Sequence, residues 1–548
     1  MDLLDNLLKR KGLAVLLLLL WGSIILFTGI GAFSLTEVDE ARFAEAAREM
    51  LVRQEFLSPY FNYAPYFNKP PLYMWLTAAT YSLLGISEIT ARLWSALFGL
   101  GTMLVVFAMG ELLFNRRVGF IAALILITGL QWTAESRLGL LNIGVSFFIT
   151  LSLLALLLAV KRERPQYYLL FFLSMGLGVL MKGPIAIIFP GLIGILYLVY
   201  ARRLRDLASP WTIAGACLML AVALPWHIVQ WLRFGHDFLG TYFGYHMVER
   251  YTCSIEGHGE PQYYYLLVLA LGMLPWSGFM PGALALSGRL WRKHREGILF
   301  LLLWFACIYA FFAVGRTKLP GYITPLYPCL SLFLAAFIGS REGQGRWLRV
   351  SYLSLFILGL LLLVAVPALQ QQIQPKYHFY IRFILYMGIT STVGGLAGWL
   401  LLRLARRTDI AIAFGALVAV IMVGVLHLGA LPMWDIHKPV KPLSRIAATI
   451  MKPDDGIASY KLGENSSPFY LRRHVRLFDT PDQLSSWLSS SDARYAMLPE
   501  AKLAEVEVSS DRKLMVISKY REYLLITNRT EGKERSNARD LDAQKVNR

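Results

Sequence analysis

Apolar runs of about 20 residues recur along most of this chain, and a helix of that length matches the hydrocarbon thickness of a bilayer. The sequence has 548 residues, of which 56% are hydrophobic and 16% charged, which excludes the ordinary soluble classes. We therefore predict an all-α polytopic membrane protein with about thirteen transmembrane helices. The first run extends from about Leu13 to Phe33, and the others are centred near Leu100, Leu126, Leu153, Leu173, Ile193, Leu220, Leu269, Leu303, Phe333, Leu360, Met387 and Val420.

The basic residues orient the predicted bundle. The net charge is +18, and Lys and Arg fall in short clusters between apolar runs, which indicates membrane topology and anionic headgroups and argues against a nucleic-acid surface. With a cytoplasmic N-terminus, every second connection is basic, as the positive-inside rule requires. An odd number of spans then places the C-terminus outside. The basic connections are 9–11, 116–117, 161–164, 202–205, 289–295, 341–349 and 403–407.

The first run follows Lys9, Arg10 and Lys11 but is too long for a signal-peptide core and lacks a small-residue cleavage site, so we expect a retained signal anchor. The four cysteines are scattered, and they form neither a disulfide framework nor a CxxC metal pair.

We expect a transmembrane domain over residues 1–434, with long outside loops at about 34–88 and 234–262. Within the first loop, residues 37–54 and 72–84 are predicted to form helices that lie along the membrane interface. Residues 435–548 have a mixed, polar composition and are predicted to form a small α/β domain on the outside, with a disordered tail after Asn528. Its expected strands are 456–460, 476–478, 495–498, 514–517 and 522–527.

Ionisable residues in the outside loops are the candidates for chemistry, because such groups at the membrane are costly to keep. Asp39 and Arg42 are spaced i, i+3 and would share one face of a helix. A solvated amphipathic face explains them about as well. Lys69 directly precedes a Pro-initiated helix, which suits a bound phosphate, and a snorkelling lysine is the plain alternative.

The second long loop and a later short one add further candidates. Arg250 is accompanied by His246 and His258, whose spacing is a weak metal signal, and surface histidines more often have no such role. Lys318 and Tyr322 lie in a short connection between two spans, where a cation beside a tyrosine can hold a lipid phosphate.

Together these segments resemble a known family. The matching motifs are Asp39–Glu45, Lys69–Pro71, Gly178–Pro184, Leu274–Trp276 and Thr317–Ile323. In this order they are similar to the GT-C superfamily of polyprenyl-phosphate-dependent glycosyltransferases, and within it to the bacterial 4-amino-4-deoxy-L-arabinose (lipid A) transferase family. The resemblance covers nearly the whole chain and implies a GT-C type bundle with periplasmic interfacial helices and a periplasmic C-terminal domain.

The resemblance also implies roles. Asp39 matches the catalytic carboxylate and Arg42 the arginine beside it, while Lys69, Arg250 and Tyr322 match positions around undecaprenyl phosphate. Lys318 is the motif lysine near Tyr322, and His258 matches a histidine of the same loop as Arg250. The chain departs from the family at Asn68, where the relatives have Glu, at Phe43, where they have Tyr, and at Asn142, where many have Asp. The first departure weakens a metal site, and an uncharged Asn142 cannot act as a base.

The expected function is therefore an inner-membrane transferase that moves a sugar, 4-amino-4-deoxy-L-arabinose, from undecaprenyl phosphate to lipid A at the periplasmic face. A protein or other glycan acceptor is the alternative within the superfamily, and a transporter of lipid-linked sugars is the alternative outside it. No cofactor is assigned, and the histidine spacing leaves a divalent metal open. Expected partners are the lipid-linked donor, lipid A or another periplasmic acceptor, and membrane lipids, with no nucleic acid.

Overall fold

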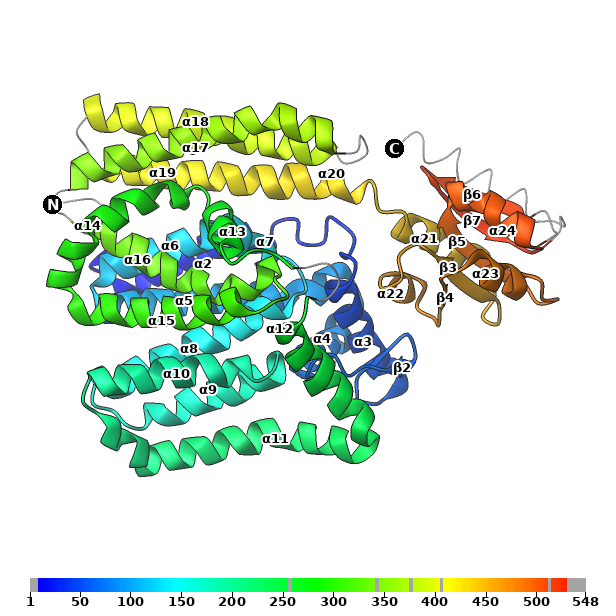
Figure 1. The fold of residues 1–548 in the computed structure, drawn as a ribbon, viewed down its shortest axis with the longest axis horizontal. Helices are drawn as coiled ribbons and strands as arrows, with labels where there is room; N and C mark the ends of the chain where they lie inside the picture. The colour runs from blue at the N-terminus through cyan, green and yellow to red at the C-terminus, as the bar shows by residue number, and fades with distance from the viewer. Residues whose placement is uncertain are drawn as a thin grey trace. The chain divides into compact units, whose positions relative to one another are not determined.

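The computed structural model describes residues 8–254, 259–340, 344–373, 378–404, 408–510 and 514–529. The chain divides into two compact units (Figure 1). Residues 1–32 and 67–432 form an all-helical unit, here called the membrane unit. Residues 33–66 and 433–548 form the second, here called the α/β unit. The segment after the first apolar helix thus belongs to the same unit as the C-terminal residues, although about 370 residues separate the two stretches.

Long apolar helices make up the membrane unit. In the part of the chain that the structure describes, eight helices are long and apolar enough to cross a membrane, and two further pairs are each bent, by 67° and 106°, at a short break. Shorter apolar helices are α2 (Lys11–Phe27), α9 (Tyr167–Met181) and α10 (Ile185–Tyr200). Five of the eight spans lie in α5 (Glu88–Leu113), α8 (Leu141–Lys161), α15 (Arg295–Val314), α17 (Gln344–Gln372) and α18 (His378–Leu404). The other three are the helical stretches Pro210–Thr252, which begins with α11 (Pro210–Leu239), Pro320–Gly339, which ends with α16 (Tyr327–Gly339), and Ile410–Asp435, which contains most of α19 (Thr408–Gly424). The bent pairs are α6 (Arg116–Thr128) with α7 (Leu130–Ser136), and α13 (Tyr264–Gly272) with η3 (Trp276–Phe279) and α14 (Met280–Lys293).

Each predicted apolar run contains a helix, which confirms the polytopic all-α prediction, and the count of thirteen spans stays a prediction. Residues 234–252, expected in a loop, continue α11 as helix through η2 (Gly240–Glu249) and α12 (Arg250–Thr252). Gly235, with φ +52°, interrupts the helical backbone there and kinks it without ending it. Residues 255–258 lie outside the described residues.

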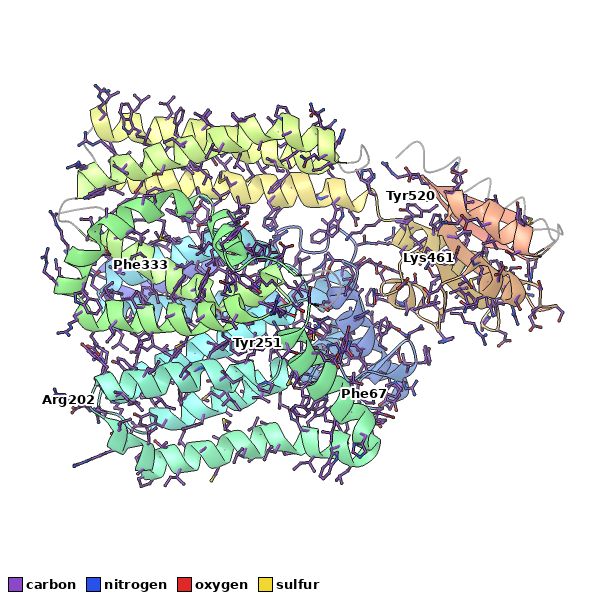
Figure 2. The ribbon with its side chains drawn as sticks, viewed as in Figure 1. Phe67, Arg202, Tyr251, Phe333, Lys461 and Tyr520 are labelled. Atoms are coloured by element: carbon purple, nitrogen blue, oxygen red, sulfur yellow. The ribbon has the colours of Figure 1, made fainter. Side chains whose placement is uncertain are left out.

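The helices of the membrane unit carry their basic connections at one end. α8 ends at Lys161, α10 is followed by Arg202 and Arg203, and α15 begins at Arg295. The opposite ends of the same helices carry Asn142, Pro184 and Gly315. In Figure 2, Arg202 and Tyr251 lie toward opposite ends of α10. These three basic connections therefore lie at the same end of the bundle, in agreement with the sequence pattern.

A five-stranded mixed sheet forms the core of the α/β unit, in the order β4-β3-β5-β7-β6. Strand β5 pairs with β3 in parallel and with β7 antiparallel. Its side chains alternate: Tyr495 and Met497 pack with α21 and α22, and Ala496 and Leu498 pack with α23 and α24. The bounds are β3 (Gly456–Tyr460), β4 (Arg476–Phe478), β5 (Arg494–Pro499), β6 (Met515–Tyr520), β7 (Tyr523–Thr527), α21 (Val440–Ile450), α22 (Ser467–Leu471), α23 (Pro481–Leu488) and α24 (Leu503–Ser510).

These strands confirm the predicted α/β fold, and all five lie within three residues of the expected bounds. The tail predicted after Asn528 lies outside the described residues from position 530 onward. Helix α4 (Leu72–Leu84), which belongs to the membrane unit, has the predicted bounds, and α3 (Asp39–Arg53) lies within its predicted range.

Hydrogen bonds join the segment 33–66 to the rest of the α/β unit. Asn62 Nδ2 donates to the carbonyl oxygen of Val475 at 2.8 Å, and the amide of Val475 donates back to Asn62 Oδ1 at 3.0 Å. The amide of Leu35 donates to the Tyr470 hydroxyl at 2.7 Å. These bonds satisfy backbone groups from both stretches, so α3 and the sheet form one folded body.

Candidate functional site

A cavity of about 370 Å³ opens in the membrane unit where the ends of several helices meet, a volume typical of ligand sites. Three cationic side chains from separate segments line it, namely Lys69, Lys182 and Arg250. We call it the cationic pocket. Its other walls are largely apolar, so it offers both charge for an anionic head and a surface for hydrocarbon. The remaining lining residues are Gly183, Pro184, Ile185, Ile188, His246, Met247, Val248, Tyr251, Thr252, Phe311, Phe312, Gly315, Thr317 and Tyr322.

Local sequence explains how two of the cations are presented. Lys69 is followed by Pro70 and Pro71, and Pro71 is the N-cap of α4. Lys182 is the C-cap of α9, and Pro184 is the N-cap of α10. Between them Gly183 has φ +125°, a backbone conformation that side chains disfavour, which lets the chain reverse within one residue. Both lysines therefore lie at helix junctions and are half-buried at the cavity.

Arg250 and Tyr322 come together because their segments share backbone hydrogen bonds. The amides of Arg316 and Thr317 donate to the carbonyl oxygens of Tyr251 and Arg250, at 3.0 and 3.4 Å. The resulting register places Arg250 Nη1 3.4 Å from the Tyr322 hydroxyl oxygen. Lys182 Nζ lies 5.5 Å from the centroid of the Tyr322 ring, within cation–π range. Tyr322 thus contacts two of the three cations.

Lys318 lies beside the cationic pocket and is buried, with 5% of its surface exposed. Its Nζ donates to the carbonyl oxygen of Gly315 at 2.6 Å. Burial, together with the neighbouring Arg316, lowers the pKa of Lys318. In this geometry Lys318 holds the 315–318 loop, whose residues Gly315 and Thr317 line the cavity.

The predicted residues Asp39 and Arg42 belong to the α/β unit. Asp39 is the first residue of α3 and is exposed, and Arg42 Nε donates to Asn465 Oδ1 at 2.6 Å. Val38, just before Asp39, has φ +71°, which is strained for a β-branched residue. The Glu37 carboxylate accepts hydrogen bonds from the amides of Asn465 and Ser466. The first turn of α3 is thereby tied to the loop before α22.

Four other charged residues of α3 are buried, namely Glu40, Glu45, Arg48 and Glu49, whereas Arg53 at the end of the helix is exposed. Glu40 accepts from the amide and hydroxyl of Thr36, and Glu49 accepts from the amide of Tyr63. Arg48 donates two hydrogen bonds to Glu45, both at 2.7 Å. Burial dominates over this pairing and raises the pKa of Glu45 to about 7. Partners within the same unit make the burial of these groups tolerable.

Among the described residues, no group of three or more His, Cys, Asp or Glu side chains is arranged to hold a metal ion. His246 lines the cationic pocket, and His258 lies outside the described residues. A metal role for this pair stays a prediction.

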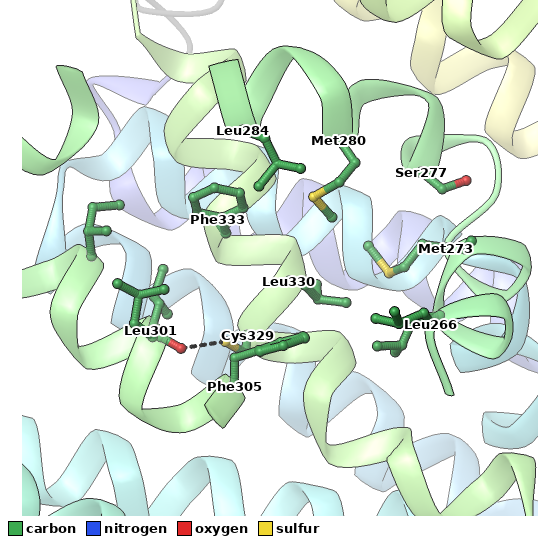
Figure 3. A pocket seen from close by; sticks show the side chains of 14 residues that line it. Leu266, Met273, Ser277, Met280, Leu284, Leu301, Phe305, Cys329, Leu330 and Phe333 are labelled. Carbon is green, nitrogen blue, oxygen red and sulfur yellow. Dashed lines mark hydrogen bonds between the residues drawn. The ribbon is translucent and has the colours of Figure 1, made fainter. Parts of the chain in front are cut away.

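A second cavity, of about 410 Å³, lies among α13, η3, α14, α15 and α16 (Figure 3). Its lining is almost wholly apolar, with side chains such as Leu266, Met273 and Phe305, and Cys329 Sγ donates to the carbonyl oxygen of Leu301. None of the fourteen residues drawn carries a charge, so this cavity supplies no group for acid–base or phosphate chemistry.

Sequence reasoning placed Lys182 in a family motif but gave it no role, and it overlooked Glu135. A usable signal for Lys182 existed, because a lysine just before a Pro-initiated helix occurs at Lys69 as well. Glu135 gave no comparable signal. It is the next-to-last residue of α7, it is 7% exposed, and residues distant in sequence bring it close to the pocket.

The arrangement can bind the phosphate of an amphipathic lipid. Three cations converge on a cavity with apolar walls, and charge-assisted hydrogen bonds from such groups stabilise a phosphate strongly. Cations held in place before reaction also stabilise negative charge that develops on a leaving phosphate.

Comparisons with known proteins agree with this geometry. Residues 68–229 match the family model described as dolichyl-phosphate-mannose-protein mannosyltransferase. An undecaprenyl phosphate-alpha-4-amino-4-deoxy-L-arabinose arabinosyl transferase of Aeromonas salmonicida is 30% identical over 470 residues, which cover 83% of this chain and 84% of the relative. A protein of the same name from Yersinia pestis is 31% identical over 337 residues, which cover 61% of this chain and 60% of that one.

The fold is similar to that of solved structures of ArnT from Cupriavidus metallidurans. The structure bound to undecaprenyl phosphate superposes with a TM-score of 0.81 at 22% identity and covers 94% of this chain and 98% of that one. The apo structure gives a TM-score of 0.80 with the same coverage. With its helical membrane unit, its C-terminal sheet and its sequence identity over most of the length, the chain belongs to the family of undecaprenyl phosphate-alpha-4-amino-4-deoxy-L-arabinose arabinosyl transferases.

Proposed function

We propose that this protein transfers 4-amino-4-deoxy-L-arabinose from undecaprenyl phosphate to a phosphate group of lipid A. The family membership supports the donor, because the relative from Aeromonas salmonicida is named for it. The observation that carries the proposal is the convergence of Lys69, Lys182 and Arg250 on one cavity with apolar walls. A polyprenyl phosphate has the matching chemistry, an anionic head on a hydrocarbon chain.

In the proposed reaction, the bond between the anomeric carbon of the sugar and the phosphate oxygen breaks. The electron pair leaves on the lipid phosphate, and the cations of the pocket stabilise this charge. An oxygen of the acceptor phosphate forms the new bond to the anomeric carbon. Because that oxygen is already anionic, the acceptor needs positioning and charge screening more than a base.

We assign Asp39 to the orientation of the acceptor, with Arg42 beside it. Its exposure at the first turn of α3, next to the strained Val38, is what supports this role, because strained backbone persists where the surrounding structure holds it for function. Asp39→Asn should reduce transfer and leave the binding of undecaprenyl phosphate unchanged. Full transfer by this variant in membranes would remove the role.

We place the protein in the inner membrane, with its N-terminus and basic connections in the cytoplasm and the cationic pocket on the periplasmic side. Along α10 and α15 the basic connection lies at one end and the pocket residues lie at the other, which supports this orientation. Single cysteines introduced near Lys69 and near Arg203 should react with an impermeant reagent from opposite sides. Labelling of both from the same side would contradict it.

The decisive experiment is transfer by the purified full-length protein from undecaprenyl phosphate-linked aminoarabinose to lipid A, read by mass spectrometry. The expected product is lipid A with one added aminopentose, and the donor should be converted to undecaprenyl phosphate. Lack of transfer to lipid A with an intact, donor-binding protein would refute the proposed acceptor.

A protein acceptor is the second candidate, because the family model matching residues 68–229 is described as a protein mannosyltransferase. A hydroxyl acceptor requires removal of a proton. Supplying membrane proteins in place of lipid A separates the two candidates, since only this alternative predicts a sugar on protein.

A further inference from the structure

A carboxylate that the reaction described above does not use lies buried close to the cationic pocket. Glu135 accepts hydrogen bonds from Gln131 Nε2 at 2.8 Å, from Thr324 Oγ1 at 2.9 Å and from Asn142 Nδ2 at 3.2 Å. All three donors are neutral. A buried carboxylate is costly to maintain, so its full set of donors calls for an explanation.

Asn142 joins this carboxylate to the pocket. Its Nδ2 donates to Glu135, and its Oδ1 accepts a hydrogen bond from Lys182 Nζ at 2.5 Å. These two contacts fix the orientation of the amide, because the reversed amide would face a carboxylate with its oxygen and an ammonium with its NH₂ group. The order Glu135, Asn142, Lys182 is therefore a directed chain of hydrogen bonds that ends at a pocket cation.

The segment that carries Tyr322 packs against this chain. A Cβ at Gly321 would lie 2.2 Å from Asn142 Nδ2, so a side chain there would displace the amide. The next residue, Tyr322, has its ring 5.5 Å from Lys182 Nζ. One short stretch of backbone thus contacts both the middle and the end of the chain.

We propose that Glu135 is a positioning residue that holds the Lys182 ammonium at the pocket through Asn142 without pairing with it directly. A direct carboxylate–ammonium pair would compete with a lipid phosphate for the same cation. The intervening neutral amide gives the ammonium an acceptor, and the carboxylate behind that amide adds a favourable field without contacting the ammonium. This inference rests on the proposed function, because it takes the pocket's ligand to be a polyprenyl phosphate.

The test is a double-mutant cycle on the full-length protein with undecaprenyl phosphate as the probe. Glu135→Gln should weaken binding about tenfold, as the loss of charge-assisted positioning predicts, and raise the KM for the donor more than it lowers kcat. If Glu135 acts through Lys182, then Glu135→Gln made in a Lys182→Ala background should have no further effect. Equal losses in both backgrounds, or wild-type affinity of Glu135→Gln, would overturn the proposal.

Two further variants test the middle of the chain of hydrogen bonds and provide a control. Asn142→Ala breaks the same chain and should reproduce the loss of Glu135→Gln, with no extra loss in the combined variant. If Glu135→Gln fails to fold, Asn142→Ala takes its place in the double-mutant cycle with Lys182→Ala. Wild-type affinity of Asn142→Ala for undecaprenyl phosphate would also contradict the proposed chain of hydrogen bonds. Glu296→Gln is the matched control, because Glu296 pairs with Lys161 and Tyr197 near the start of α15, about 28 Å along the helix from Gly315.

The outcomes separate the two proposals. If the wild-type protein does not bind undecaprenyl phosphate, the proposed function fails. If the wild type binds it and loses affinity on Lys182→Ala but not on Glu135→Gln, the function stands and the positioning role of Glu135 fails alone.

Discussion

Charged side chains cluster in two regions of this protein, and the two clusters differ in what the side chains contact. In the cationic pocket of the membrane unit, Lys69, Lys182 and Arg250 come from three separate segments and face a cavity. On α3 of the α/β unit, Glu40, Glu45, Arg48 and Glu49 come from one helix and are buried among partners in the same unit. A charged motif is therefore weak evidence for chemistry until its partners are known, and charge that faces a cavity is the stronger indication.

The largest effect that this contrast predicts is at Arg250. Arg250→Ala should reduce transfer at least about 100-fold, as expected when a cation that stabilises a leaving phosphate is removed, and should leave the thermal unfolding midpoint close to that of the wild type. Arg203→Ala is the matched control, because Arg203 pairs with Asp206 at the basic end of the bundle. A comparable loss of transfer in both variants would mean that a cation in the pocket contributes no more to the reaction than one at the basic end.

Arg48 should behave in the opposite way. Arg48→Ala leaves Glu45 and Glu49 buried without a neighbouring cation and should destabilise the α/β unit by about 3–5 kcal/mol. Hydrogen exchange at the amides of β5 measures this locally, and the exposed Arg476→Ala serves as the control. If the β5 amides of Arg48→Ala kept wild-type protection from hydrogen exchange while transfer was lost, Arg48 would act in the reaction and not in the stability of the α/β unit.

The pH dependence of the α/β unit sharpens the same point. The pKa of Glu45 is raised to about 7, so the folded unit keeps a proton that the unfolded chain releases near its ordinary value. Stability should therefore fall as the pH rises from about 4.5 through 7, by up to about 3 kcal/mol from this group. Hydrogen exchange of β5 at pH 5 and pH 7.5 tests the sign, and Glu45→Gln should flatten the profile. A profile unchanged by that substitution would assign the dependence to another group.

The smallest effect is expected at Asn465, which accepts a hydrogen bond from Arg42 Nε. Asn465→Ala should lower transfer about threefold to tenfold, because a hydrogen bond to a charged group is lost, with little change in undecaprenyl phosphate binding. Asn465→Asp restores an acceptor for the guanidinium and should recover most of the activity. If alanine and aspartate behave alike, the contact does not position Arg42.

Much of the fold could be predicted because its signals are local. The apolar periodicity and Pro70–Pro71 give α4 its observed bounds, and alternation in β5 matches a sheet covered on both faces. The bends after Thr128 and Gly272 and the helical continuation past Phe234 were not predictable in this way, because packing decides them. The site shows the same limit: Lys69, Arg250 and Tyr322 were proposed from motifs, whereas Glu135 approaches Asn142 and Lys182 only in the folded chain.

The discontinuity of the α/β unit has a consequence for how the protein is made. Residues 33–66 leave the ribosome long before the stretch that begins at Met433, with which they fold. At about 5–20 residues per second, this interval lasts roughly 20–75 s. During that time Glu37 and Arg42, near the start of α3, lack the hydrogen-bond partners that Asn465 and Ser466 later provide. If synthesis stopped before Met433, residues 33–66 would therefore be left without the part of the unit with which they fold.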